Sequence, residues 1–225
     1  MYPYVAAATG LTSCLPPNAQ GAQLYTRLAS AEQRAAIRRE IETPTGFWEN
    51  LCALATPENV LISRLSTPTL RKYSGQRLAQ IAADMGVDWI DAVFTLIRTE
   101  RNRVETIYFL MDEANVVENM RRPWMKFGSD AGGPNPRAAS GLVHPRSYGT
   151  FTRVLGPYVR DQQVIPLEDA VRKMTWATAR RLGIQERGLL APGFFADVVV
   201  FDPNTVTDRA TFERPHQLSV GVLRS

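Results

Sequence analysis

Apolar residues recur at helical spacing along much of the chain, most clearly near its middle. A stripe at positions i, i+3, i+4 and i+7 is formed by Ile90, Val93, Phe94 and Ile97. This spacing places the four side chains on one face of a helix. Residues 74–100 predict two helices, because Gly86 separates them and Asp88 is a good N-cap. Similar patterns predict helices at about 22–42, 47–54, between Asp112 and Pro123, at 151–159 and at 167–174. Within the first, Ser30 followed by Gln33 resembles a capping box, and Asp112 can cap the helix before Pro123.

Three short segments have the composition of strands. Residues 60–63 and 104–110 are rich in β-branched or aliphatic side chains, and the apolar run 124–129 ends at Asp130. Strands and helices therefore alternate along the chain. This order predicts an α/β fold with a parallel sheet.

The pattern changes near Gly183. Residues 188–203 contain a turn, a glycine-bearing bend and then a strongly β-forming run. They predict a second, small β unit, which has too few strands to form a stable sheet by itself.

Composition narrows the range of functions only slightly. Hydrophobic residues make up 44% of the chain and charged residues 21%, which is typical of an ordinary folded protein. The net charge of +4 comes from 26 basic and 22 acidic residues that are interspersed, so nucleic acid is not expected as a partner. No apolar stretch approaches the roughly 18 residues of a membrane span, so no membrane association is expected.

Cys14 and Cys52 are the two cysteines of the chain. Their number and spacing fit neither a disulfide framework nor a metal motif, so the sequence predicts two small buried thiols in a reducing compartment. The start of the chain has no basic region typical of a signal peptide. A cytoplasmic location is the default expectation.

The window from Met125 to Gly133 contains the best candidate for catalytic chemistry. Asp130 follows an apolar run and opens a loop rich in Gly and Pro. Parallel α/β proteins present catalytic side chains at this point, beyond the carboxyl ends of their strands. Arg146, sixteen positions later, can bring a positively charged guanidinium to the same loop. The alternative is that Asp130 only forms a turn before Gly132 and Gly133.

Several motifs resemble the amidohydrolase superfamily. The spacing G-x(4)-G-x-x-A-D-x-V-x-x-D is matched by Gly188, Gly193, Ala196, Asp197, Val199 and Asp202. Residues 173–183 resemble the helix that precedes this signature. The segments Tyr2-Pro3-Tyr4, Leu15-Pro16-Pro17 and His144 to Phe151 are similar to the D-aminoacylase branch, the N-acyl-D-amino-acid deacylases.

The resemblance implies the C-terminal part of a (β/α)8 barrel of the metal-dependent hydrolase type. Residues 1–183 would form this part, with a helical insert at about 18–120, and residues 184–225 would form part of a small β-sandwich domain. The implied reaction is zinc-dependent deacylation of N-acyl-D-amino acids, with a small N-acyl amino acid as the partner. The preceding strands would carry the other zinc ligands. We therefore expect the chain alone to be a fragment without activity.

The resemblance also assigns roles to individual residues. Asp130 would take the proton from a zinc-bound water and pass it to the leaving nitrogen, and it is a possible metal ligand. Arg146 would hold the α-carboxylate of the substrate through its planar fork. Tyr2 and Tyr4 are either substrate-binding phenols or aromatic residues of the core or rim.

Four further residues are expected to be structural. His144 matches no metal ligand of the family and is expected to shape its loop. His216 is expected in a turn, and Asp197 and Asp202 are expected to brace turns. Two alternatives to the deacylase remain open, a cyclic-amide hydrolase of the same superfamily and a non-catalytic binding or assembly module.

Overall fold

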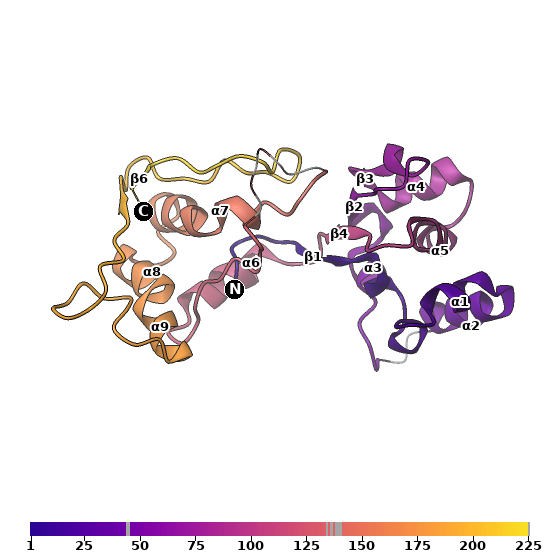
Figure 1. The fold of residues 1–225 in the computed structure, drawn as a ribbon, viewed down its shortest axis with the longest axis horizontal. Coiled ribbons are helices and arrows are strands. Elements are labelled where there is room, and N and C mark those ends of the chain that lie inside the picture. Colours follow the sequence, from indigo (N-terminus) through magenta and orange to yellow (C-terminus); the bar gives the residue numbers. More distant parts are fainter. Residues whose placement is uncertain (44–45, 134, 136, 138–140, 225) are drawn as a thin grey trace. The chain divides into compact units, whose positions relative to one another are not determined.

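The computed structural model describes residues 1–43, 46–133, 135, 137 and 141–224. Its α-helices are α1 (Leu24–Ala29), α2 (Ala31–Glu42), α3 (Leu51–Ala55), α4 (Leu78–Met85), α5 (Trp89–Glu100), α6 (Glu113–Arg121), α7 (Arg146–Arg153), α8 (Leu167–Met174) and α9 (Trp176–Leu182). Its strands are β1 (Ala7–Gly10), β2 (Val60–Arg64), β3 (Gln76–Arg77), β4 (Glu105–Tyr108), β5 (Val200–Phe201) and β6 (Val222–Arg224). Figure 1 shows these elements along the chain. None of the described helices is long and apolar enough to cross a membrane.

The described residues form two compact units. The first, here the C-terminal unit, contains Met1–Val5 together with described residues of Asp112–Ala139 and Val143–Ser225. The second, here the sheet unit, contains described residues of Ala6–Met111 and Ser140–Leu142. Residue 183 is not a boundary between these units. The small β domain expected at 184–225 therefore stays a prediction.

The sheet unit is built on a four-stranded sheet in the order β1-β4-β2-β3. Every pairing in it is antiparallel, with Ala7 opposite Tyr108 and Val60 also opposite Tyr108 on the other side of β4. The fold contains both helices and strands, as predicted, but the prediction of a parallel sheet is wrong. Helices α4 and α5, which lie between β2 and β4, are joined by a short turn and return the chain in the opposite direction.

Local signals set the ends of these helices as the sequence predicts. The hydroxyl of Ser30 accepts the N–H of Gln33 at the start of α2. Gly86 ends α4 in a left-handed conformation, and a carboxylate oxygen of Asp88 accepts two N–H groups at the start of α5. The apolar face of α5 is buried in the core of the sheet unit, where Phe94 is 2% exposed.

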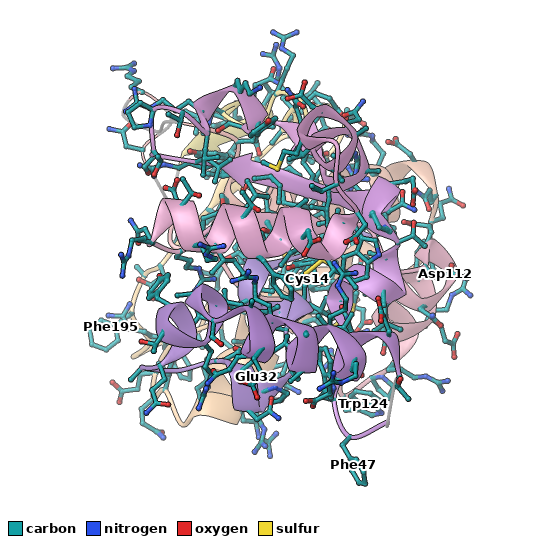
Figure 2. The ribbon with its side chains drawn as sticks, turned by 90° about the vertical axis from the view of Figure 1, so that its right-hand side faces the viewer. Cys14, Glu32, Phe47, Asp112, Trp124 and Phe195 are labelled. Carbon is teal, nitrogen blue, oxygen red and sulfur yellow. A yellow bond between two sulfur atoms is a disulfide. The ribbon has the colours of Figure 1, made fainter. Side chains whose placement is uncertain are left out.

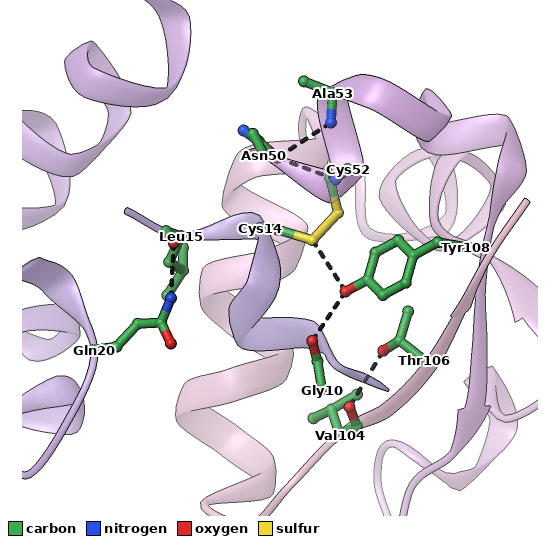
Figure 3. Close-up of a disulfide and its surroundings, with 10 residues drawn as sticks. All are labelled: Gly10, Cys14, Leu15, Gln20, Asn50, Cys52, Ala53, Val104, Thr106 and Tyr108. Carbon is green, nitrogen blue, oxygen red and sulfur yellow. Dashed lines mark hydrogen bonds between the residues drawn. A yellow bond between two sulfur atoms is a disulfide. The ribbon is translucent and has the colours of Figure 1, made fainter. Parts of the chain in front are cut away.

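Cys14 and Cys52 form a disulfide inside the sheet unit (Figure 3). The prediction of two separate thiols is therefore wrong. Their positions lie 38 residues apart, and the fold brings the short 3₁₀ helix Leu11–Cys14 against α3. The hydroxyl of Tyr108 lies 3.5 Å from the sulfur of Cys14 and donates to the carbonyl of Gly10. A disulfide is typical of oxidising compartments, so the reducing-compartment expectation loses its basis.

The C-terminal unit has its own core around α6, α8 and a π-helix at Val154–Asp161. Two glycines allow residues 205–208 to approach α7 and the π-helix closely. A Cβ on Gly156 would lie 2.4 Å from the carbonyl oxygen of Val206, and one on Gly149 would lie 2.7 Å from the Cβ of Asp208. Side chains at these two positions have no room.

Two segments of the C-terminal unit have less β structure than the sequence predicts. Residues 124–129 were expected to form a strand, but the described part of the chain has no ladder there. The ammonium group of Met1 donates to the carbonyl of Lys126, and the carbonyl of Met1 accepts the N–H of Gly128. Among its described residues, the tail forms the short pair β5–β6 and an isolated antiparallel bridge between Thr207 and Val220, and several of its apolar side chains are exposed. Large exposed apolar side chains also occur at Phe47 and at Phe195 (Figure 2).

Candidate active site

Asp130 lies at the end of the extended segment 124–129, in the C-terminal unit. Its backbone has a φ of 50°, in the left-handed region that Asp tolerates better than most residues. Its side chain is 72% exposed. The carboxylate is therefore largely exposed to solvent, and it contacts a cation.

That cation is Arg146, the first residue of α7. The Nη2 atom of Arg146 lies 3.0 Å from Oδ2 of Asp130, although the Arg146 side chain is only 9% exposed. The ring of Tyr2 lies against the guanidinium, with 4.4 Å between Cζ and the ring centroid. The structure thus brings together Asp130, Arg146 and Tyr2, three of the four residues that the sequence selects.

Tyr2 is partly buried beside this ion pair. Burial raises the pKa of the Tyr2 phenol above its usual value, Arg146 opposes the rise through its charge and a hydrogen bond, and Asp130 adds to it. The phenol is therefore neutral at physiological pH and keeps its proton to donate.

Tyr4 is placed differently, since it is 3% exposed. Its hydroxyl donates to Oδ2 of Asp208 at 3.2 Å, and its ring lies 4.7 Å from the Cζ atom of Arg153. Burial and the neighbouring charge of Asp208 raise the pKa of Tyr4. The structure gives this phenol a buried partner, so its expected contact with substrate stays a prediction without geometric support.

Sequence reasoning missed the ion pair between Arg153 and Asp208. Their side chains lie 3.1 Å apart, and the Asp208 side chain is 6% exposed. One sequence signal was available: Arg153 follows Arg146 by seven residues, which places both on the same face of a helix. The pairing itself is not visible in the sequence, because Arg153 and Asp208 lie 55 positions apart.

His144 directly precedes the helix that carries Arg146. Its Nδ1 atom accepts the backbone N–H of Arg146 at 3.0 Å, and the residue is 5% exposed. Its ring makes edge contacts with Tyr2 and Tyr4. The expectation that His144 shapes its loop is confirmed.

The acidic residues of the tail signature and His216 make structural contacts, as expected. Asp197 pairs with Arg187, and Asp202 accepts the backbone N–H of Asn204 in a turn. The Nδ1 atom of His216 lies 3.3 Å from the hydroxyl of Tyr148. These contacts give the three side chains structural partners in or near the tail.

The described residues do not suffice for a metal site. Among them, no group of three or more His, Cys, Asp or Glu side chains is placed to hold a metal ion. A catalytic zinc needs about three protein ligands. Asp130 can be one ligand at most, so the described residues do not complete a zinc site.

The geometry supports two chemical tasks. An exposed carboxylate can accept and return a proton, and a guanidinium held by a ring and a carboxylate can orient a second anion. The two groups are in contact, since Asp130 forms an ion pair with Arg146 at the start of α7.

Comparison with known proteins places this site in context. Residues 125–224, which include Asp130 and Arg146, match the model of the amidohydrolase family. A D-aminoacylase of Alcaligenes xylosoxydans xylosoxydans is 45% identical over 151 residues, covering 67% of this chain and 29% of the relative. An N-acyl-D-aspartate deacylase of the same organism is 40% identical over 167 residues, covering 71% and 32%.

Solved structures are similar as well. The crystal structure of N-acyl-D-glutamate deacylase from Bordetella bronchiseptica, complexed with zinc and a phosphonate inhibitor, aligns with a TM-score of 0.69 at 36% identity. The alignment covers 99% of this chain and 36% of that chain. The chain thus spans about a third of the length of the proteins it matches.

Proposed function

We propose, from the premise that this chain belongs to the amidohydrolase family, that it contributes to a hydrolase that cleaves the amide bond of N-acyl-D-amino acids. The products would be a carboxylic acid and a free D-amino acid. The observation that carries the proposal is the contact between Asp130 and Arg146, because deacylation needs a proton-transferring carboxylate near a binding group for the substrate carboxylate.

Each residue of the site has a separate proposed task. Asp130 accepts a proton from the attacking water and delivers it to the leaving nitrogen, for which its exposed carboxylate is accessible. Arg146 binds the α-carboxylate of the substrate, and Tyr2 supports the guanidinium through its ring. Tyr4 would act on the substrate only if its hydroxyl left Asp208.

The rest of the site is proposed to come from outside these 225 residues. A (β/α)8 barrel completed by further strands would supply the metal ligands that the described residues do not assemble. The zinc in the similar Bordetella bronchiseptica structure supports zinc as the metal. Zinc would provide the activated water, and Asp130 is the residue of this chain proposed to lie beside it.

A chimaeric enzyme tests the proposal. In the D-aminoacylase of Alcaligenes xylosoxydans xylosoxydans, residues 1–225 of this chain replace the matching segment, and hydrolysis of N-acetyl-D- and N-acetyl-L-amino acids is measured. We expect zinc-dependent turnover of D-substrates. A chimaera that folds and binds zinc but hydrolyses no acylated amino acid would contradict the proposal and favour a non-catalytic module.

A cyclic-amide hydrolase is the second candidate, because a dihydroorotase of Lactobacillus johnsonii is 24% identical over 164 residues. Arg146 distinguishes an N-acyl amino acid from a cyclic amide that has no free carboxylate, since such a cyclic amide gives the guanidinium little to bind. An N-acyl amino acid always presents a free α-carboxylate to it. Turnover of cyclic amides in preference to N-acyl-D-amino acids by the same chimaera would support the second candidate.

A further inference from the structure

His144 contacts the candidate substrate anchor through the backbone. Helix α7 starts at Arg146, and its N-cap residue, Pro145, has no side chain that can accept a hydrogen bond. The first N–H groups of a helix lack partners within the helix. The Nδ1 atom of His144 accepts the first of them, from Arg146, and its carbonyl oxygen accepts the N–H of Ser147 at 3.1 Å.

His144 also contacts the ring that lies against the guanidinium. The His144 ring meets Tyr2 edge-on at a centroid distance of 5.5 Å, and Tyr2 in turn lies 4.4 Å from Cζ of Arg146. The ring meets Tyr4 at 5.3 Å and Phe212 at 5.1 Å in the same manner. Aromatic neighbours on several sides fix the plane of the imidazole.

We propose that His144 is a positioning residue for Arg146, a role that rests on the proposed function of Arg146 as the anchor of the substrate carboxylate. His144 holds the start of α7 through Nδ1 and holds Tyr2 through its ring edge. The main chain and one side of the guanidinium are thereby fixed by one residue. The anchor is ordered before substrate arrives, so binding does not carry the cost of ordering it.

The direction of the hydrogen bond defines the required chemistry. Because Nδ1 accepts, the neutral imidazole carries its proton on Nε2. The essential element at this position is thus an acceptor two residues before the N–H of Arg146. Asn provides the same acceptor in an Asx-turn and is well tolerated before proline, whereas Phe provides a ring without an acceptor.

Two substitutions in the chimaera separate positioning from simple filling of space. His144→Phe keeps an aromatic ring and should raise KM for N-acetyl-D-amino acids about tenfold, since one hydrogen bond is lost, with kcat changed less than about threefold. His144→Asn should stay within about threefold of the unsubstituted chimaera in KM. His216→Phe is the control, because His216 contacts Tyr148 and should leave KM unchanged.

Two results would overturn the proposal. One is an unchanged KM in His144→Phe, and the other is an equal rise of KM in His144→Asn and His144→Phe, as expected for a residue that only fills space. His144→Leu, which is smaller and also lacks the acceptor, carries the same expectation as His144→Phe and replaces it if that variant does not fold.

A second measurement is independent of catalysis. Hydrogen exchange of the Arg146 amide in the 225-residue chain should be slow in the wild type and in His144→Asn and faster by about tenfold in His144→Phe. Unchanged protection in His144→Phe would overturn the positioning role. An inactive chimaera combined with the expected exchange pattern would contradict the proposed function and leave the hydrogen-bonding part of the positioning role supported.

Discussion

The Nη2 atom of Arg146 lies 3.0 Å from Oδ2 of Asp130, and the two side chains differ widely in exposure, at 9% and 72%. The arginine is the fixed member of this pair, held by the start of α7 and by the ring of Tyr2. The aspartate faces solvent and is accessible to a reactant. These are the properties that the proposed roles of substrate anchor for Arg146 and proton carrier for Asp130 require.

Arg146→Lys in the chimaera should raise KM for N-acetyl-D-amino acids by about 10- to 100-fold. Lysine keeps the charge but loses the planar fork that binds a carboxylate through two hydrogen bonds. Arg181→Lys, an exposed substitution in α9, should have no effect. Steady-state kinetics on both variants measures the two KM values. An unchanged KM in Arg146→Lys would rule out the anchoring role.

Gly156→Ala should destabilise the C-terminal unit by about 1–3 kcal/mol. Alanine normally favours a helix over glycine, but here its Cβ would lie 2.4 Å from the carbonyl oxygen of Val206, and overpacking outweighs the propensity gain. Gly132→Ala, with open space around its Cβ, should change the free energy of unfolding by less than about 0.5 kcal/mol. Urea unfolding monitored by circular dichroism measures both, and equal effects would argue against the close approach at Gly156.

Removal of the disulfide by the double substitution Cys14→Ala and Cys52→Ala should lower the free energy of unfolding of the sheet unit by about 2–4 kcal/mol. The bond closes a loop of 38 residues, which restricts the unfolded chain. Dithiothreitol should destabilise the wild type and leave the double variant unaffected. Mass spectrometry after alkylation without reductant provides the check, since two alkylated cysteines in the oxidised protein would show that the bond does not form.

The sheet unit should lose stability in acid partly through Glu100. Burial alone would raise the pKa of this carboxyl, but the N–H groups of Thr67 and Ser66 donate to it and hold the pKa below its usual value. Its contribution is then complete above the pKa of an unfolded glutamate, about 4.3, and is lost as the pH falls through the lower folded value. Glu100→Gln should flatten this part of the stability curve. Parallel curves for the variant and the wild type between about pH 5 and pH 2 would contradict this assignment.

Local signals in the sequence predicted the helix ends well. Ser30, Gly86, Asp88 and Asp112 act through groups within a few residues, and each caps its helix as expected. The contact of Asp130 with Arg146 was also anticipated, because both residues belong to one loop and the helix that follows it. Features that depend on residues close together in the sequence could therefore be predicted.

Features that depend on distant residues were not predictable in this way. The direction of the sheet depends on how α4 and α5 return the chain, and the disulfide depends on contact between segments 38 residues apart. Strand β1 was missed because its sequence, Ala-Ala-Thr-Gly, has little strand propensity. Its pairing partner in the sheet is β4, which lies about 100 residues later in the sequence. The hydroxyl of Tyr4 donates to Asp208, which lies 204 positions away in the sequence.

The most direct test of the proposed chemistry is the kcat of the chimaera with Asp130→Asn. Asparagine has nearly the same shape but cannot carry the proton, so kcat for N-acetyl-D-amino acids should fall by about 10²- to 10⁴-fold, while the protein stays folded. Asp197→Asn, in the tail, should retain kcat within about threefold. A chimaera that keeps full kcat with Asp130→Asn would contradict the role of Asp130 as the proton carrier.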